Sequence, residues 1–562
     1  MLLTQCLLNR GLSELVPLQR FLRPRLQHLA DPFLLPAMDA AVERLLRARL
    51  RREPLVIFGD YDVDGVTSTA LLTEVLQAFG WQVHHYLPHR LDEGYGLSQE
   101  GVANCLEQFP VPLLLAVDCG STAQAAVDWL ARRSVDVIVL DHHQISEPAP
   151  AASALVNPRA SRNSAFNELA SVGLAFKLAH ALVKRGRQLG LAGAHQYDLR
   201  PLFDLVALGT IADLVPLTGE NRILVTVGLE RLNSTQRPGL QALRAVAQAN
   251  RRLGVYEVGF QLAPRLNAAG RLENAEAALE LLLARDLAEA EPLAQALDAQ
   301  NRERQNIERS IAEEAIGQVR SRFNPASDYV IVEGQLLWHI GVVGIVASRV
   351  LREFYRPTII LGGDNYEWRG SGRSIEGFDL AAALRECTDL LVRHGGHAMA
   401  AGLSIQPAKL DAFRERLNGL ARRTLTADQL QPTLQLDAEL TPRELTLELV
   451  AELDQLQPTG QNNLPVQLAF RRVSHGRPPQ RLGKEKQHAR LWVTDGVTTH
   501  EAVWWGVGNA ELPSGRFDLA FIPQINEFNG RRSVQLRVLD WRKAGSPTPL
   551  STLDARPSTL PA

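Results

Sequence analysis

The chain contains three short apolar segments of β-strand character, and each is followed at once by acidic or imidazole side chains. These pairs are PLVIF (54–58) with GDYDVDG (59–65), PLLLA (112–116) with VDCG (117–120), and DVIVL (136–140) with Asp141-His142-His143. Helix-like segments separate the runs, a pattern typical of a doubly wound parallel sheet. Because the carboxyl ends of such strands open into one crevice, the sequence predicts an α/β fold in which these polar groups meet.

Several carboxylates and imidazoles in one crevice cannot all remain charged and unpaired, because burying an unpaired charge is costly. A pair of divalent metal ions is the simplest way to hold them. The candidate ligands lie in these three loops and in the apolar run GTIADLVPL (209–217): Asp60, Asp62, Asp64, Asp118, His142, His143 and Asp213. A mixture of carboxylates and imidazole suits Mn²⁺ or Mg²⁺ better than zinc.

The string GDYDVDG also matches the start of an EF-hand loop. The twelfth position of such a loop should be Glu, whereas Leu71 stands there, and a strand rather than a helix precedes the loop. A plain acidic turn would be a second alternative if the motif stood alone. The other acidic and imidazole motifs favour a metal site instead.

Composition limits the kind of protein this can be. The 562 residues are enough for about three to four domains. A net charge of -2 excludes a polycation, so any nucleic-acid surface must be a local groove. The four cysteines lack CxxC spacing, which favours a reducing compartment. The N-terminus does not read as a signal peptide, and there is no long apolar stretch, so we expect a cytoplasmic protein that does not enter a membrane.

The pattern of strands and helices changes along the chain and predicts six segments. A helical N-terminal segment (1–45) precedes the doubly wound sheet (46–230) and a helical connector (231–325), in which one long helix is expected over 273–323. A second, smaller α/β domain (326–425) and a small β-barrel (426–545) follow. The Pro/Ser/Thr-rich tail (546–562) is expected to be disordered.

The order of the motifs carries a family resemblance. GDYDVDG, VDCG, DHH (141–143) and ALGTIAD, in that order, resemble the DHH phosphoesterase superfamily. Further motifs resemble its RecJ branch of single-stranded-DNA-specific exonucleases: APRLNAAGR (263–271), WHIGVVGIVASRV (338–350), RGSGRS (369–374), GGHAMAAG (395–402) and LQPTGQNNLP (456–465). The resemblance covers roughly residues 45–540. It implies that 46–230 is a DHH domain, 326–425 a DHHA1-type domain and 426–545 an OB-type barrel.

The resemblance also implies roles for individual residues. The family's metal-binding positions are matched by Asp60, Asp62, Asp118, His142 and Asp213, with Asp64 and His143 in the same motifs. Asp118 would bridge two ions, and His143 would stabilise phosphoryl oxygens or hold a ligand in place. Many members of the superfamily have His where Phe58 stands, and here Asp60 is expected to take that role.

Substrate contacts are implied in the same way. Arg90 and Tyr95 match a segment near the family's 5′-end pocket. Positions that grip substrate phosphates are matched by Arg271, Ser371, Arg373 and His397. Two Gly-rich turns, around Gly370–Gly372 and Gly395–Gly396, would let the backbone approach phosphate closely.

The predicted barrel carries aromatic side chains interleaved with arginine. The aromatics are Trp492, Trp504, Trp505, Phe521 and Phe528, and the arginines are Arg490, Arg531, Arg532 and Arg537. Stacking and cationic contacts suit sequence-independent binding of a single strand. At least half of these aromatics are expected to be core residues.

Together these features favour a metal-dependent enzyme that degrades single-stranded DNA to 5′-mononucleotides in repair and recombination, with the 5′→3′ direction implied by the resemblance alone. A phosphodiesterase for cyclic dinucleotides or short oligonucleotides is the alternative, and the predicted barrel counts against it. A non-catalytic scaffold is disfavoured by the intact acidic set. The expected partners are single-stranded DNA and, from the family, a single-strand-binding protein and a helicase, with a monomer favoured.

Overall fold

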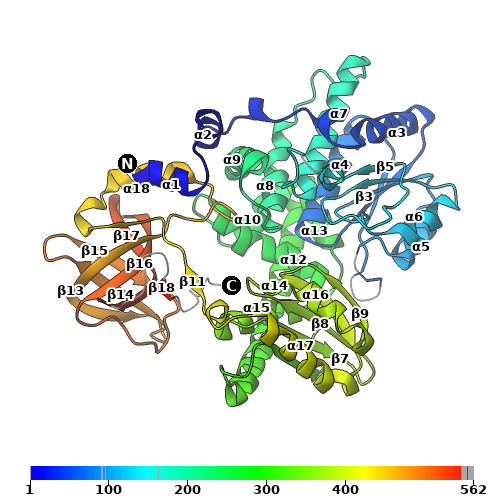
Figure 1. Cartoon of the computed structure of the whole chain (residues 1–562). Helices are drawn as coiled ribbons and strands as arrows, with labels where there is room; N and C mark the ends of the chain where they lie inside the picture. Colours follow the sequence, from blue (N-terminus) through cyan, green and yellow to red (C-terminus); the bar gives the residue numbers. More distant parts are fainter. Residues whose placement is uncertain (1, 90–92, 95, 162–163, 546–552, 555–562) are drawn as a thin grey trace. The chain divides into compact units, whose positions relative to one another are not determined.

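The computed structural model describes residues 2–89, 93–94, 96–161, 164–545 and 553–554 (Figure 1). It divides into two units. The first unit comprises Glu14–Arg304 together with Leu456–Leu464. The second unit comprises Met1–Ser13, Gln305–Gln455 and Pro465–Ala562.

The first unit contains the predicted parallel sheet. Its strands are β1 (Leu55–Gly59), β2 (Val83–Tyr86), β3 (Leu113–Val117), β4 (Asp136–Leu140) and β5 (Ala154–Val156), in the order β2-β1-β3-β4-β5. All neighbours pair in parallel. The strand order reverses between β1 and β3, which is the arrangement of a doubly wound fold. The fold class predicted for this part is confirmed, and β5 is an additional strand.

β1 and β3 are apolar throughout because both of their faces are buried, whereas the edge strand β2 carries His84 and His85. Leu55 and Ile57 pack into one core, beside α3 (Met38–Arg51), α4 (Val63–Ala78) and α7 (Ser171–Gln188). Val56 and Phe58 pack into the opposite core, beside α5 (Gln99–Gln108) and α6 (Gln124–Ala131). Phe58 stacks on Tyr86 with ring centroids 5.5 Å apart, so it is a core residue.

The rest of the first unit is helical. Its helices are α2 (Leu15–Leu22), α8 (Phe203–Ala212), α9 (Gly219–Asn233), α10 (Pro238–Val246), α11 (Val255–Glu257), the π-helix η5 (Val258–Leu262), α12 (Ala263–Leu272) and α13 (Glu276–Leu283). The long helix α14 (Leu287–Arg322) contains the point where the units divide.

The long helix was predicted over 273–323, and α14 begins later than that. Asp286 Oδ1 accepts a hydrogen bond from Glu289 N (2.9 Å), and Glu289 Oε2 accepts one from Arg285 N (3.0 Å). This reciprocal pair caps the start of α14 and separates it from α13.

The second α/β domain lies in the second unit. Its strands are β6 (Ile331–Leu336), β7 (Thr358–Gly363), β8 (Trp368–Arg373), β9 (Leu391–Gly396) and β10 (Ala400–Ile405), in the order β6-β7-β8-β10-β9. Only β6 and β7 pair in parallel. The helices are α15 (Val343–Phe354), α16 (Leu380–Arg385) and α17 (Leu410–Thr424), and the end of α14 shares a core with α15.

The two Gly-rich segments are strands, so the prediction that they form turns was wrong. Gly370 and Gly372 lie in β8, and a Cβ atom at these positions would come within 2.6 Å of Leu361 and 2.5 Å of Leu380. Gly395 and Gly396 end β9. Glycine in β8 is therefore required by close packing within the domain. Gly395 differs, because a Cβ atom there would meet no other group within 4 Å and would point into open space.

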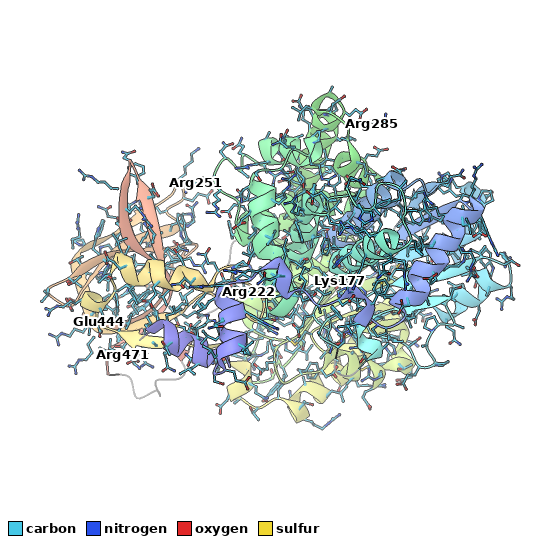
Figure 2. The ribbon with its side chains drawn as sticks, turned by 90° about the horizontal axis from the view of Figure 1, so that it is seen from above. Lys177, Arg222, Arg251, Arg285, Glu444 and Arg471 are labelled. Carbon is cyan, nitrogen blue, oxygen red and sulfur yellow. The ribbon has the colours of Figure 1, made fainter. Side chains whose placement is uncertain are left out.

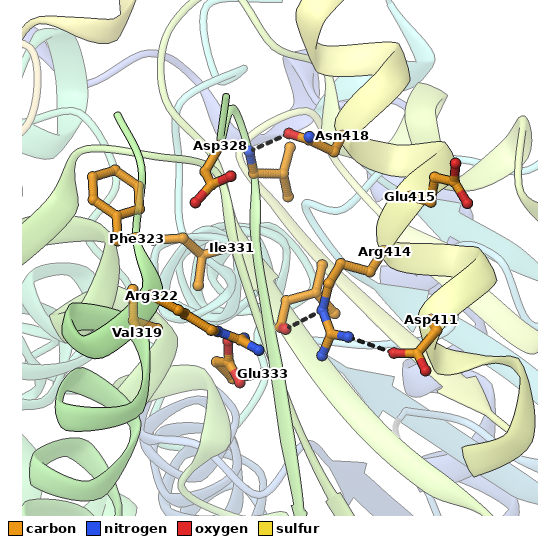
Figure 3. A pocket seen from close by; sticks show the side chains of 12 residues that line it. Val319, Arg322, Phe323, Asp328, Ile331, Glu333, Asp411, Arg414, Glu415 and Asn418 are labelled. Carbon is orange, nitrogen blue, oxygen red and sulfur yellow. Dashed lines mark hydrogen bonds and ion pairs between the residues drawn. The ribbon is translucent and has the colours of Figure 1, made fainter. Parts of the chain in front are cut away.

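A cavity of about 380 Å³ lies between the end of α14, the edge strand β6 and α17 (Figure 3). Arg414 donates to Val332 O (3.1 Å) and to Asp411 Oδ1 (2.6 Å). Asn418 Oδ1 accepts from Tyr329 N (2.8 Å), and Arg322 pairs with Glu333. Arg414 and Asn418 thus satisfy backbone groups at the β6 edge of the sheet, which would otherwise offer a template for another strand.

The C-terminal domain is a closed barrel. Its strands are β13 (Leu468–Leu482), β14 (His488–Thr494), β15 (Thr499–Trp504), β16 (Phe517–Phe528) and β17 (Arg531–Lys543). They pair in the circuit β13-β14-β15-β17-β16, and β16 pairs back to β13. The short strand β12 (Ala438–Leu440) adds to β13, and α18 (Leu447–Leu453) precedes the barrel. The predicted OB-type barrel is confirmed.

Two short elements lie near the two ends of the described chain. The helix α1 (Leu2–Asn9) belongs to the second unit, and Leu553–Asp554 form β18, which pairs with β11 (Thr433–Leu434). The remainder of the predicted disordered tail (546–562) lies outside the described residues. Within the described part of the chain, every helix falls short of the length and apolarity that a membrane crossing requires.

The packing of β8 makes a stability prediction. Gly372→Ala would place a methyl group against Leu380 and Ile359, so we expect the free energy of unfolding to fall by about 1–3 kcal/mol. Gly402→Ala on β10 is the matched control, because its nearest neighbour is Gly370 O at 3.9 Å. Urea denaturation of the full chain measures both, and equal stability of the two variants would contradict the packing argument.

Candidate metal centre

Strand-end loops of the parallel sheet place the acidic residues. Asp60 follows β1, Asp118 follows β3 and Asp141 follows β4. Asp62 is the N-cap of α4, and its Oδ1 accepts from Asp64 N (2.9 Å) and Gly65 N (3.2 Å). Asp118 has a φ of 62°, a left-handed conformation that is uncommon for a residue other than glycine. Such strained backbone is found mainly at functional sites.

All seven candidate residues of the sequence come together. Their potential ligand atoms form three groups, in each of which the atoms lie within 4.8 Å of one another: Asp60 with Asp62 and Asp118; Asp118 with His142 and His143; and Asp64 with His142 and Asp213. His142 Nε2 lies 3.4 Å from Asp118 Oδ1 and 3.6 Å from Asp213 Oδ2. Asp118 and His142 each belong to two of these groups, so the three groups form one continuous cluster.

Asp141 fixes the orientation of the histidine pair. Its carboxylate accepts from the backbone N–H groups of Ser121 (2.9 Å), His142 (2.8 Å) and His143 (3.1 Å), and it bonds His143 Nδ1 (2.8 Å). Burial would raise the pKa of Asp141, but its bonds to His143 and the nearby imidazoles outweigh burial and lower it. For His143, burial lowers the pKa, but Asp141 and the other carboxylates outweigh it and raise the pKa, so the imidazolium is favoured.

Asp64 is held by the start of α7. Its two oxygens accept from Ser171 N (2.7 Å) and Val172 N (2.8 Å). The residue at the N-cap of this helix, Ala170, supplies no side-chain cap, so Asp64 satisfies these backbone donors from a distant part of the sequence. Burial and then the charge of Asp62 raise the pKa of Asp64 to about 7.

Sequence reasoning missed the polar residues that support this cluster. Ser171 Oγ donates to Asp118 Oδ1 (2.9 Å), and Asn267 Oδ1 accepts from Val63 N (3.2 Å). Asn157 Nδ2 donates to Ser121 Oγ (2.8 Å) and to His143 O (2.9 Å), and Arg159 Nε donates to His142 O (2.7 Å). The lack of a capping side chain at Ala170 is a local sign that the start of α7 is held from elsewhere, but it does not identify the bond from Ser171 to Asp118.

The electrostatics of the cluster favour a bound cation. Burial, followed by the charges of neighbouring carboxylates, raises the pKa values of Asp118 and Asp213 well above their ordinary value. Within the described residues, Asp213 Oδ2 is buried and makes no hydrogen bond. A set of carboxylate oxygens with one imidazole nitrogen fits Mn²⁺ or Mg²⁺, and the polar residues around it supply the outer support that metal ligands need.

The other predicted site residues are placed as follows. Arg271 is half-buried near the end of α12 in the first unit. Ser371 and Arg373 lie on β8 in the second unit, where Arg373 Nη1 donates to Ser371 Oγ (2.9 Å). His397 is exposed between β9 and β10. Arg90 and Tyr95 lie outside the described residues.

Metal-free stability should depend on pH. Asp64, Asp118 and Asp213 have raised folded-state pKa values, so the folded chain binds their protons more tightly than the unfolded chain does. Their stabilisation is complete below about pH 4 and is lost as the pH rises through the folded pKa, which for Asp64 is about 7.

We therefore expect the melting temperature in EDTA to fall between about pH 5 and pH 7.5, and Mn²⁺ to reverse the fall. Asp118→Asn removes one of the crowded charges and should flatten this dependence, whereas Glu291→Gln on the exposed surface of α14 should leave it unchanged. Scanning calorimetry across this range tests the prediction. Identical slopes for Asp118→Asn and the unaltered chain would refute it.

Three parts of the chain match known protein families. Residues 54–210 match the DHH family, N-terminal domain; residues 327–423 match the DHHA1 domain; and residues 436–540 match the RecJ OB domain. The chain is 39% identical over 562 residues to the single-stranded-DNA-specific exonuclease RecJ of Dickeya dadantii, covering 96% of this chain and 95% of the relative. It is 37% identical to RecJ of Bacillus subtilis, covering 96% and 67%.

A solved structure is also similar. The crystal structure of RecJ from Thermus thermophilus in complex with Mn²⁺ superposes with a TM-score of 0.81 at 31% identity, covering 97% of this chain and 76% of that chain. The same protein in complex with Mg²⁺ gives a TM-score of 0.75. Three matched domains, near-complete coverage and the shared architecture lead to one conclusion: the chain belongs to the RecJ family of single-stranded-DNA-specific exonucleases.

Proposed function

We propose that this protein is a divalent-metal-dependent exonuclease that degrades single-stranded DNA in the 5′→3′ direction to 5′-mononucleotides, in DNA repair and recombination. The observation that carries the proposal is the convergence of seven acidic and imidazole side chains at the carboxyl edge of the parallel sheet. The relatives named above are single-stranded-DNA-specific exonucleases, and the similar Thermus structures hold Mn²⁺ or Mg²⁺.

The cluster is proposed to hold two divalent ions, Mn²⁺ or Mg²⁺. The proposed ligands are Asp60, Asp62, Asp118, His142 and Asp213, with Asp118 shared between the ions. Asp64 belongs to the same cluster, and its bonds to the start of α7 let it fix the loop as well as contribute charge. When bound, such ions polarise the scissile phosphate and make a nucleophile available from water near neutral pH.

His143 is proposed to act on the substrate. Asp141 engages its Nδ1, which leaves Nε2 as the ring nitrogen that can donate to a phosphoryl oxygen. Asp141 and the other carboxylates raise the pKa of His143 despite its burial, which favours the protonated ring. Asp141 thus positions the imidazole of His143, while Asp118 and His142 hold the ions. The loop after β4 places Asp141, His142 and His143 side by side.

The second α/β domain is proposed to bind substrate phosphates. Arg373 and Ser371 project from one strand and are joined by a hydrogen bond, so they form a ready-made donor pair. Exposed His397 and the open space beside Gly395 add a donor and a close backbone approach. Arg271 is also proposed to bind substrate phosphates. Arg90 and Tyr95 are still predicted to lie near the 5′ end of the strand.

The barrel is proposed to provide the track for the single strand. Phe521 and Trp492 are buried and serve the core, whereas Phe528 is 71% exposed and Trp505 is 46% exposed. Phe528 pairs across the β16–β17 hairpin with Arg531, and Arg532 is exposed beside it. Base stacking on such aromatics with nearby cations gives affinity without sequence preference.

We propose that the protein acts in the cytoplasm as a monomer, beside a single-strand-binding protein and a helicase. All four cysteines are free and buried, which suits a reducing compartment. The proposed domain boundaries remain 1–45, 46–230, 231–325, 326–425, 426–545 and 546–562.

Loss of a metal ligand should abolish activity without unfolding the protein. We expect Asp118→Ala and His142→Ala to lower Mn²⁺-dependent mononucleotide release by more than about a hundredfold, beyond the range usual for residues that only support a ligand. His85→Ala, on β2 and outside the cluster, is the matched control. End-labelled single- and double-stranded substrates report product size and direction, and circular dichroism reports folding. Full activity in Asp118→Ala or His142→Ala would contradict the site, and preference for short oligonucleotides or cyclic dinucleotides would favour a phosphodiesterase.

Loss of an exposed barrel aromatic should weaken strand binding and spare the chemistry. Phe528→Ala should cost about 1–3 kcal/mol of affinity for a long single strand, the usual value of one stacked base. Val497→Ala is the control, because Val497 is also 71% exposed on the barrel but has no ring. Fluorescence anisotropy measures both affinities. Equal affinities for Phe528→Ala and Val497→Ala would show that this ring does not stack on DNA.

A further inference from the structure

Arg222 is a buried arginine that bonds main-chain carbonyls from two distant parts of the sequence. It lies on α9 with 2% of its surface exposed (Figure 2). Its Nε donates to Phe21 O (2.8 Å), its Nη1 to Leu456 O (2.9 Å) and Pro458 O (3.3 Å), and its Nη2 to Gln457 O (2.7 Å). The guanidinium also lies 3.8 Å from the centre of the Phe21 ring.

The segment 456–464 is folded tightly onto the same place. Asn463 is 1% exposed, and its Nδ2 donates to Leu456 O (2.8 Å) and Pro458 O (2.9 Å), which closes the segment into a compact loop. Leu217 N donates to Gln461 O (2.9 Å). Gly460 packs against Leu217 so closely that a Cβ atom would lie 2.7 Å from Cδ1 of that residue.

Both segments that Arg222 holds lead directly into the second unit. The chain up to Gln455 and from Pro465 onward belongs to that unit, so 456–464 is a short excursion of its chain into the first unit. At the N-terminus, α2 with Phe21 belongs to the first unit, whereas Met1–Ser13 belong to the second. There, Asn9 Nδ2 donates to Asp437 O (3.0 Å) and Arg10 Nη1 to Asp437 Oδ1 (3.0 Å), next to β12 of the barrel domain.

The physics of a buried guanidinium makes this anchor cooperative. A buried cation is costly unless its donors are satisfied, and Arg presents five donors in a rigid fork. The carbonyls of Phe21 and of Leu456–Pro458 satisfy different nitrogens of that fork. Release of either segment would leave buried donors unpaired, so the two segments stabilise one another through Arg222. Lysine, with one point charge, could not match this geometry.

We propose that Arg222 is the positioning residue that fastens the two chain segments leading to the barrel domain onto the unit that carries the metal centre, and that this attachment determines how many nucleotides are removed in one encounter with DNA. The inference rests on the proposed function, because it assigns a strand-binding role to the barrel. Two binding elements joined by a short, fixed connection hold one strand at a high effective concentration. Release of the anchor would free these segments from the first unit and lower that concentration.

The test compares long and short substrates in Arg222→Met, which keeps a long apolar side chain and removes the donors. With a trap of unlabelled single-stranded DNA present, we expect about tenfold fewer nucleotides to be released from a long strand per encounter. A change of this size is within the range by which linking two binding sites alters overall affinity. The turnover of an oligonucleotide too short to reach the barrel should change by less than about twofold. Hydrogen exchange at 456–464 should become faster.

Two further variants keep the test decisive. Arg244→Met removes a guanidinium that donates to Ala249 O (2.9 Å) and Arg251 O (2.9 Å), carbonyls of the first unit alone, and should leave the length dependence intact. Asn463→Ala removes the bonds to Leu456 O and Pro458 O that keep the segment compact, so it should reproduce the effect of Arg222→Met. If Arg222→Met does not fold, Asn463→Ala takes its place in the test. The variant that combines Arg222→Met with Asn463→Ala should release as many nucleotides per encounter as the more strongly affected single variant, because both substitutions break the same attachment.

The outcomes separate the two proposals. Equal losses on long and short substrates, or an unchanged number of nucleotides per encounter despite faster exchange at 456–464, would overturn the role of Arg222. Failure of the unaltered protein to release nucleotides with Mn²⁺ would overturn the proposed function, and hydrogen exchange would still show whether Arg222 anchors the segment.

Discussion

The protein depends on a concentration of buried negative charge at the carboxyl edge of its parallel sheet. Asp118 stands at the centre of it, in a left-handed backbone conformation and shared between two groups of potential ligands. Such crowding is tolerated in part because backbone and side-chain donors are oriented toward several of these carboxylates. The backbone donors at the start of α7 hold Asp64, and the donors around Asp141 hold the histidine pair. A bound divalent cation would neutralise the remaining negative charge of the carboxylates.

Buried charged side chains are also paired or hydrogen-bonded in parts of the first unit away from the metal centre. Lys177, with its side chain fully buried, pairs with Glu220 at 2.7 Å and donates to Ala30 O at 2.9 Å, which fixes the N-terminal segment on α7 and α9. Arg222, two residues along α9, fixes Phe21 and the segment 456–464. Buried cations therefore hold the irregular parts of the first unit to its helices, while apolar packing holds the sheet.

The sequence predicted the parts of the fold that depend on local pattern. Continuous apolar strands, each ending in Asp or His, indicated both the doubly wound sheet and the convergence of Asp60, Asp118 and His142, because the carboxyl ends of parallel strands share one edge. The start of α14 was placed too early, because a helical composition continues through 284–286 while a capping pair at Asp286 and Glu289 ends one helix and begins another.

Features that depend on contacts between distant segments could not be predicted. Gly370 and Gly372 indicated a turn by composition, yet they are strand residues whose missing side chains admit Leu361 and Leu380. The bond from Ser171 to Asp118 joins residues on α7 and after β3, and no local pattern encodes it. The motif LQPTGQNNLP (456–465) falls within the segment predicted to be the barrel (426–545), whereas Leu456–Leu464 pack with the first unit.

The central claim is that the acidic cluster binds divalent cations. Anomalous diffraction from crystals soaked in Mn²⁺ tests it most directly, because it locates the ions independently of activity. We expect strong anomalous peaks within coordinating distance of Asp118 and His142, one on either side of the Asp118 carboxylate. Peaks confined to other parts of the surface, or a cluster that stays free of manganese at saturating concentration, would contradict it.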